Sequence, residues 1–104
     1  MESDFQHNLI VEIKQRFPGC IVMKNDPNYI QGIPDLLVLH KKYWAALECK
    51  KSANEPFRPN QPYYIATMNK MSYASAVYPE NKEAVLNDLE RTFRPHRSTR
   101  TVRG

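Results

Sequence analysis

The chain has 104 residues, a length typical of one domain, and its 41% hydrophobic and 25% charged residues are ordinary for a globular protein. No apolar run approaches the ~20 residues that span a bilayer, and the start is acidic and polar, which argues against a membrane or secreted protein. Cys20 and Cys49 form neither a CxxC pair nor a zinc spacing, so we expect buried thiols in a reducing cytoplasm.

The net charge of +4 is concentrated at the carboxyl end. With the last four arginines set aside, 11 basic residues remain against 11 acidic ones; the four are Arg94, Arg97, Arg100 and Arg103. We therefore expect one domain over residues 1–93 and a basic, flexible tail over residues 94–104. Two interpretations of the tail stay open: an arm that binds an anionic polymer, or a solvated, disordered terminus.

Residues from about Ser3 to Arg16 predict an amphipathic helix. At about 100° per residue, one face collects the apolar side chains Phe5, Leu9, Ile10, Ile13 and Phe17. The run Ser3-Asp4-Phe5-Gln6 fits a capping box, which puts Glu2 at the helix start, close to the buried side. Pro18-Gly19 ends the helix.

Three strands are expected next. The β-branched run Cys20–Met23 predicts the first, and a polar loop rich in turn formers follows it. Leu36–Leu39 is apolar at every position, which is typical of a central strand covered on both faces. After a short loop, Trp44–Lys50 predicts an antiparallel partner for that strand.

Charged residues mark one end of this predicted hairpin. Asp35 precedes the first strand, and Glu48 and Lys50 close the second. Alternation puts Leu47 and Cys49 on one face of the second strand and the two charged residues on the other. Antiparallel pairing would bring all three charged groups to one end of a sheet.

The remaining elements complete an α-β-β-β-α-β-α order. Pro59-Asn60-Gln61-Pro62 predicts a helix start, since proline is tolerated in a first turn. We expect this helix to reach about Met71 and to bury Tyr64, Ile65, Met68 and Met71. Tyr73–Tyr78 predicts a strand, and Pro79-Glu80 opens a last helix that packs Val85, Leu86, Leu89 and Phe93 inward. The order predicts an α/β fold with a central mixed sheet flanked by helices.

Two interpretations of Glu48 and Lys50 follow. One is an edge strand with a solvated charged face and a surface ion pair. The other is a functional site, because charges in a strand embedded in apolar sequence are costly to bury. Asp35 favours the second, since two carboxylates held together repel one another and a divalent cation such as Mg²⁺ or Mn²⁺ relieves that cost. A lysine alongside can act on an attacking water or on charge at a phosphate.

These motifs resemble the PD-(D/E)XK nuclease superfamily, in Pro34-Asp35 followed by Glu48-Cys49-Lys50. Within it, the chain is most similar to the VRR-NUC type, and the resemblance covers about residues 2 to 78. The matching segments are Glu2, Gly32-Ile33-Pro34-Asp35-Leu36-Leu37, Trp44 through Lys50, and Pro59-Asn60-Gln61. The chain looks like the small stand-alone members found in bacteriophages, which implies a restriction-endonuclease-like core and a location in the cytoplasm of the bacterial host.

The resemblance also implies roles for individual residues. Asp35, Glu48 and the backbone carbonyl of Cys49 would bind Mg²⁺, with Mn²⁺ as a substitute, and Lys50 would act on the attacking water and the scissile phosphate. Gln61 would support the site, and Glu2 would bind metal directly or through water. The implied activity is a structure-selective DNA endonuclease on branched DNA such as four-way (Holliday) junctions, usually as a homodimer.

The residues themselves suggest further DNA contacts and leave other functions open. Lys24, Lys51 and Arg58 lie in expected loops beside the site, where they are candidates for phosphate contacts or ordinary surface charge. With the tail arginines they form the expected DNA-binding set. The alternatives are a flap or single-strand nuclease, a non-catalytic DNA-binding module with this fold, and an interaction protein without affinity for DNA.

Overall fold

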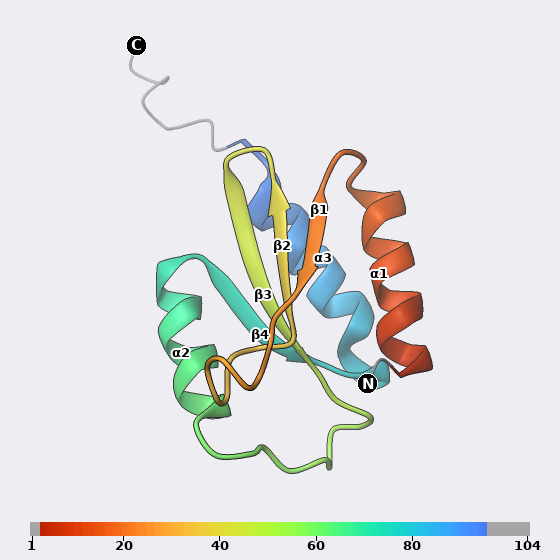
Figure 1. Cartoon of the computed structure of the whole chain (residues 1–104). Helices are drawn as coiled ribbons and strands as arrows, with labels where there is room; N and C mark the ends of the chain where they lie inside the picture. Colours follow the sequence, from red (N-terminus) through yellow and green to blue (C-terminus); the bar gives the residue numbers. More distant parts are fainter. Residues whose placement is uncertain (1–2, 96–104) are drawn as a thin grey trace.

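The computed structural model describes residues 3–95, which form a mixed four-stranded sheet with three α-helices (Figure 1). The elements are α1 (Asp4–Arg16), β1 (Ile21–Lys24), β2 (Leu36–His40), β3 (Tyr43–Cys49), α2 (Gln61–Met71), β4 (Tyr73–Val77), the short 3-10 helix η1 (Pro79–Asn81) and α3 (Lys82–Phe93). The predicted α/β class and the predicted order of helices and strands are confirmed.

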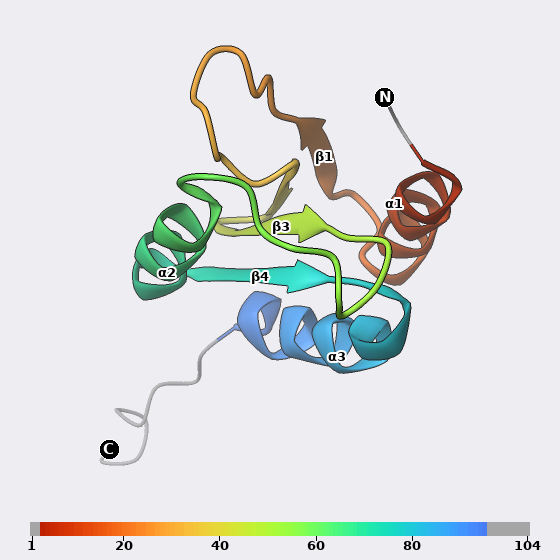
Figure 2. The same ribbon diagram turned by 90° about the horizontal axis from the view of Figure 1, so that it is seen from below.

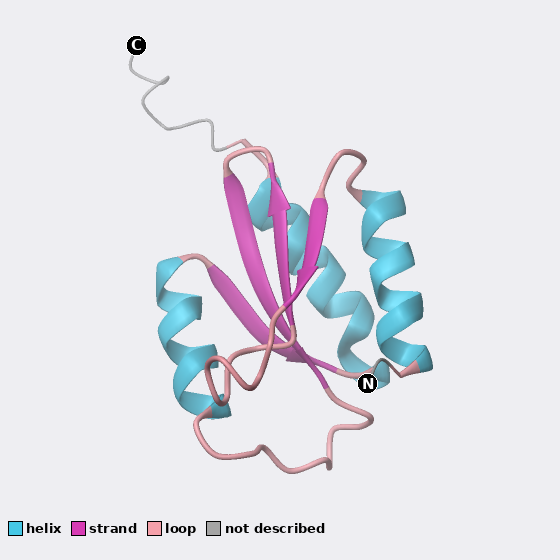
Figure 3. Ribbon diagram, in the orientation of Figure 1, coloured by secondary structure: helices cyan, strands magenta, loops and turns pink. Residues whose placement is uncertain are grey.

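The sheet has the strand order β1-β2-β3-β4 (Figure 3). The first three strands are antiparallel neighbours, whereas β4 runs parallel to β3. A parallel pair needs a crossover connection, and α2 supplies it. In this order β2 and β3 are the two central strands. The uninterrupted apolar run of β2 predicts its central position.

The helices cover both faces of the sheet. Helices α1 and α3 pack on the face that carries Leu47, and together they form the main hydrophobic core, with Leu9, Ile13, Leu36, Val38, Leu86 and Leu89 at most 1% exposed. Helix α2 packs against β3 and β4 on the other face, where Ala46 and Ala74 pair and leave room for it. Both views show α1 and α2 on opposite sides of the sheet (Figure 2).

The helix starts follow local chemistry, and some boundaries differ from the predictions. The Ser3 hydroxyl accepts a hydrogen bond from the Gln6 backbone N–H at 3.0 Å, which caps α1 as predicted.

Strand β1 begins and ends one residue later than predicted, so Lys24 ends a strand instead of opening a loop. Met71 is 69% exposed, which makes its predicted burial wrong, because it lies in the last turn of α2, where the chain leaves the helix for β4.

Several predictions concern residues at the ends of the chain. Glu2 and the arginines Arg97, Arg100 and Arg103 lie outside the described residues; Arg94 is exposed and follows α3 directly. Cys20 and Cys49 form no disulfide and are half-buried, less than the full burial that we expected. Burial raises the pKa of the Cys20 thiol. Within residues 3–95, no helix is both long and apolar enough to cross a membrane.

Candidate functional site

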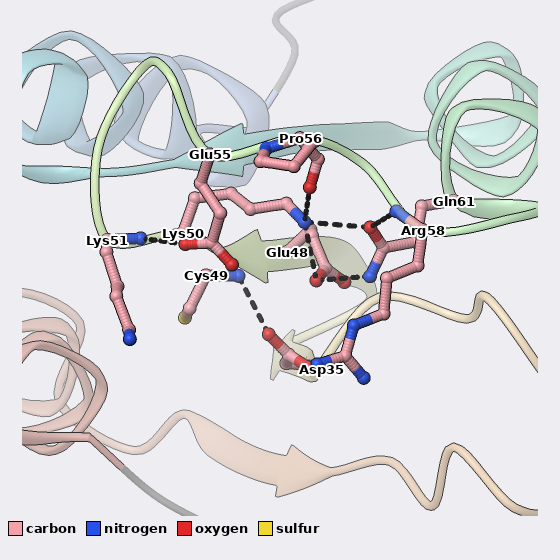
Figure 4. A network of polar contacts seen from close by, with 9 residues as sticks. All are labelled: Asp35, Glu48, Cys49, Lys50, Lys51, Glu55, Pro56, Arg58 and Gln61. Carbon is pink, nitrogen blue, oxygen red and sulfur yellow. Dashed lines mark hydrogen bonds and ion pairs between the residues drawn. The ribbon is translucent and has the colours of Figure 1, made fainter.

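The register of the β2–β3 hairpin brings Asp35 to the end of β3. Leu36 pairs with Leu47, so Asp35 lies opposite Glu48. The backbone N–H of Cys49 donates a hydrogen bond to Asp35 Oδ2 at 2.9 Å, which fixes the carboxylate against the strand (Figure 4). The predicted convergence of Asp35 and Glu48 at one end of the sheet is confirmed.

Glu48, in β3 on the face that α2 covers, and Lys50, directly after the strand, are almost fully enclosed. Glu48 is 3% exposed and Lys50 is 5% exposed. Since β3 has a neighbour on each side, the alternative of an edge strand with a solvated charged face is wrong. Burial of two charged side chains carries a free-energy cost unless both are paired and hydrogen-bonded.

Gln61, the first residue of α2, joins the two buried charges. Its Nε2 donates a hydrogen bond to Glu48 Oε2 at 2.7 Å, and its Oε1 accepts one from Lys50 Nζ at 2.8 Å. The Arg58 backbone N–H donates to the same Oε1 at 2.7 Å. Figure 4 shows these contacts converging at the start of α2. Gln61 thereby fixes the Glu48 carboxylate and the Lys50 ammonium relative to each other.

The loop between β3 and α2 supplies contacts to Lys50 that the sequence does not indicate. Lys50 Nζ donates a hydrogen bond to the Pro56 carbonyl at 3.1 Å, and it lies 4.9 Å from the centroid of the Phe57 ring. Glu48 Oε2 is 3.9 Å from the same ammonium. A carbonyl acceptor leaves no residue signature, so Pro56 could not be identified from the sequence.

The environment of Asp35 and Glu48 disfavours the charged form of both carboxylates. Burial, and then the nearby charge of Asp35, raise the pKa of Glu48 to about 7, although Lys50 and Arg58 act in the opposite direction. Burial likewise raises the pKa of Asp35, opposed by its hydrogen bond from Cys49 and by Lys50 and Arg58. Within the described residues, Glu48 Oε1 is buried and has no hydrogen-bond partner. Glu48 Oε1 is therefore available to a further partner, and the Asp35 and Glu48 carboxylates repel each other.

A cleft of about 610 Å³ opens onto this pair. The loop before β2 and the loop before α2 form its walls, and Asp35, Glu48 and Lys50 line it. Arg58 lines it as well, and its guanidinium points toward Asp35 (Figure 4). The Lys51 side chain extends away from the Glu48–Gln61 contacts, while its backbone N–H donates to Glu55 Oε1 at 2.5 Å. Of these two predicted phosphate contacts, the cleft includes only Arg58.

Close backbone packing sets the position of Asp35 relative to Gln61. The Asn25 backbone N–H donates to the Asp35 carbonyl at 2.8 Å, and Asn25 Nδ2 donates to the Pro34 carbonyl at 2.8 Å. These two hydrogen bonds hold together the two ends of the loop of residues 25–33. Gly32, at φ +92°, packs against the residues before α2; a Cβ there would lie 2.5 Å from Asn60 Cβ. Asn25 carries no signal in the sequence beyond its place in a turn-rich loop.

Replacement of Gly32 by alanine is therefore expected to disturb the site. Gly19 provides a matched control, since its φ of +90° imposes similar backbone strain but no atom lies within 4 Å of a Cβ built there. We expect Gly32→Ala to lower the free energy of unfolding by about 1–3 kcal/mol more than Gly19→Ala, because of the steric overlap with Asn60. Urea unfolding of both variants measures this difference. Equal losses would show that the close approach is unimportant.

The donor set at the cleft consists of oxygens. Asp35 and Glu48 contribute carboxylates, and Cys49, which also lines the cleft, has a backbone carbonyl. Among residues 3–95, no three His, Cys, Asp or Glu side chains gather closely enough to hold a metal ion by themselves. Glu2, the expected further acid, lies outside the described residues. Such oxygen donors suit a hard cation that keeps several water ligands.

The comparisons with known proteins identify no relative. No protein-family model matches the chain, and the searches of curated proteins and of solved structures each found no significant match.

Proposed function

We propose that the chain is a Mg²⁺-dependent DNA endonuclease of the PD-(D/E)XK type, similar to VRR-NUC proteins, that hydrolyses phosphodiester bonds in branched DNA such as four-way junctions. The observation that carries this proposal is the joining of Asp35, Glu48, Lys50 and Gln61 at one end of the sheet, in a cleft. These are the residues on which the sequence resemblance depends, and Gln61 hydrogen-bonds to both Glu48 and Lys50.

The donor set fits a magnesium ion. Glu48 Oε1 lacks a hydrogen-bond partner within the described residues, and the proximity of Asp35 contributes to the raised pKa of Glu48. A bound cation would relieve both features. Asp35, Glu48 and the Cys49 carbonyl would hold the ion, with Glu2 as a further ligand, and Mn²⁺ would substitute. When bound, the ion supplies positive charge that neutralises the carboxylates and stabilises the phosphate as negative charge develops on it.

The side chains around the ion have separate tasks in this hydrolysis. A water oxygen forms a bond to phosphorus, the ester bond to the leaving oxygen breaks, and that oxygen gains a proton while the water loses one. Lys50, held by Gln61 and Pro56, orients the water and stabilises charge on the phosphate. Gln61 hydrogen-bonds to both members of the Lys50–Glu48 ion pair and so limits how each side chain can turn within the site.

A panel of DNA substrates tests this function. Labelled single-stranded, duplex, flap and four-way-junction DNA is incubated with the protein in Mg²⁺, Mn²⁺ or EDTA. We expect cleavage of the branched substrates with either metal and none in EDTA. Binding without cleavage under all conditions would favour a non-catalytic DNA-binding module instead. Cleavage of the flap or the single strand alone would favour a flap or single-strand nuclease. The homodimer and the cytoplasmic location stay predictions.

Arg58 is expected to contact a DNA phosphate. Because each phosphate contact contributes about 0.9 to the slope of log affinity against log salt concentration, Arg58→Ala should reduce that slope by about 0.9. Lys51→Ala is the matched control, since Lys51 lies in the same loop as Arg58 but its side chain extends away from the Glu48–Gln61 contacts. Fluorescence anisotropy at several salt concentrations measures both slopes. An unchanged slope in Arg58→Ala would remove this residue from the DNA-binding set.

A further inference from the structure

A second cavity shares a lining residue with the cleft. It measures about 490 Å³, within the about 300–1,000 Å³ range of small-ligand sites. The loop of residues 25–33 forms one side, and Leu37 of β2 and Met68 of α2 form the other. Ile33 lines both this cavity and the cleft that contains Asp35 and Glu48. The two cavities are therefore neighbours that share a wall residue.

The chemistry of the second cavity differs from that of the cleft. Its walls are mostly apolar, and Asp26 is the one charged side chain among the described residues that line it. A carboxylate repels phosphate, whereas it accepts hydrogen bonds from the amino groups of nucleobases. Met68 adds a polarisable thioether that makes favourable contacts with aromatic rings. The cavity thus suits an uncharged, planar, aromatic group rather than a phosphate.

An exposed aromatic ring lies at the same cavity. Tyr29 lines it and is 85% exposed, a high value for a large aromatic side chain. The loop that carries Tyr29 is internally braced, because the Tyr29 N–H donates to the Asp26 carbonyl at 3.1 Å and the Ile33 N–H to the Ile30 carbonyl at 3.2 Å. A ring on a braced, exposed loop is a suitable platform for base stacking, which is how single-stranded nucleic acid is commonly held.

We infer that this cavity, formed by residues 25–33, Leu37 and Met68, binds one unpaired base of the DNA strand whose phosphate occupies the Asp35–Glu48 cleft. The inference rests on the proposed function and names its substrate class: DNA with an unpaired nucleotide next to the cut. A paired base is stacked between its neighbours and cannot present its face to Tyr29. Flaps and single-stranded gaps meet this requirement, a four-way junction meets it where a base pair at its centre opens, and a continuous duplex does not.

Binding of a fluorescent flap oligonucleotide tests the inference without any cleavage. The flap carries 2-aminopurine at each unpaired position in turn, and titrations are made in EDTA. Stacking on Tyr29 should change the emission at one position, and Tyr29→Ala should abolish that change and weaken binding by roughly 5- to 150-fold. Tyr63→Ala is the matched control, because Tyr63 is 63% exposed but lines neither cavity. Its binding should equal that of the wild type.

An abasic flap provides the second measurement. Removal of the base at the responsive position should weaken wild-type binding as much as Tyr29→Ala does, and the two changes together should be no worse than either alone. The inference is overturned if Tyr29→Ala weakens binding of continuous duplex equally, if Tyr29→Ala and Tyr63→Ala behave alike, or if Tyr29→Ala alters only the oligomeric state. The 2-aminopurine signal reports base binding and the labelled-substrate assay reports cleavage, so loss of one without the other distinguishes failure of the cavity from failure of the nuclease.

Discussion

Lys50→Ala is expected to lower the rate of Mg²⁺-dependent cleavage by at least about 10²–10³-fold, because it removes the cation that we propose stabilises charge at the phosphate. The Lys50 ammonium is 2.8 Å from Gln61 Oε1 and 3.1 Å from the Pro56 carbonyl, so its position is defined by the loop and α2 together. Single-turnover cleavage of a four-way junction measures the effect.

The neighbouring lysine provides the control for this variant. Lys51→Ala changes the same residue type one position along the chain, where the side chain extends away from the Glu48–Gln61 contacts, and should cleave at nearly the wild-type rate. Because Lys50 is 5% exposed, its truncation could also destabilise the fold. Lys50→Met keeps the apolar stem and separates the two effects, as does a circular-dichroism melt of each variant. Wild-type activity in a folded Lys50 variant would exclude the proposed role.

Glu48 is expected to make the metal-free protein less stable as the pH rises. Its pKa rises from 4.5 to about 7 on folding, so between these values the native state binds more protons than the unfolded state. The contribution of Glu48 to the free energy of unfolding is therefore largest below pH 4.5 and falls by about 3 kcal/mol as the pH rises to about 7. Urea unfolding in EDTA from pH 4.5 to 7.5 measures the trend.

Glu48→Gln isolates the contribution of this carboxyl group. The variant keeps an acceptor for Gln61 Nε2 but carries no charge, so it should gain stability relative to the wild type as the pH increases. Glu80→Gln, at an exposed position in η1, controls for a general change in charge. Added Mg²⁺ should stabilise the wild type more than Glu48→Gln at pH 7.5. A difference between Glu48→Gln and the wild type that does not vary with pH would contradict this account of the buried pair.

The sequence predicted the hairpin and its charged end because these depend on local patterns. Alternation along β3 assigns Leu47 and Glu48 to opposite faces, and a short loop between two apolar runs permits only antiparallel pairing. The placement of Asp35 opposite Glu48 follows from these two facts. The glutamine at the start of α2 was recognised through the family resemblance, since nothing in its own surroundings distinguishes Gln61 from an ordinary surface residue.

Other parts of the site depend on contacts between segments that are distant in sequence. The loop before α2 has no periodicity, so its contact with Lys50 through the Pro56 carbonyl could not be predicted. The close approach of Gly32 to Asn60 likewise joins two loops, although the sequence indicated a rigid turn at Gly32-Ile33-Pro34. The exposure of Met71 was missed for a related reason: helical periodicity identifies a face, but the position where the chain leaves the helix decides how far that face is covered.

Cleavage of one labelled four-way junction by the wild type and by Asp35→Asn, each with Mg²⁺ and with EDTA, tests the central claim most directly. The asparagine side chain keeps an oxygen acceptor for the Cys49 N–H, so the local fold should persist while the proposed metal ligand loses its charge. We predict cleavage by the wild type with Mg²⁺ only, and none by Asp35→Asn with either. Metal-independent cleavage by the wild type, or equal cleavage by folded Asp35→Asn, would contradict the assignment of this carboxylate pair as a metal-dependent nuclease site.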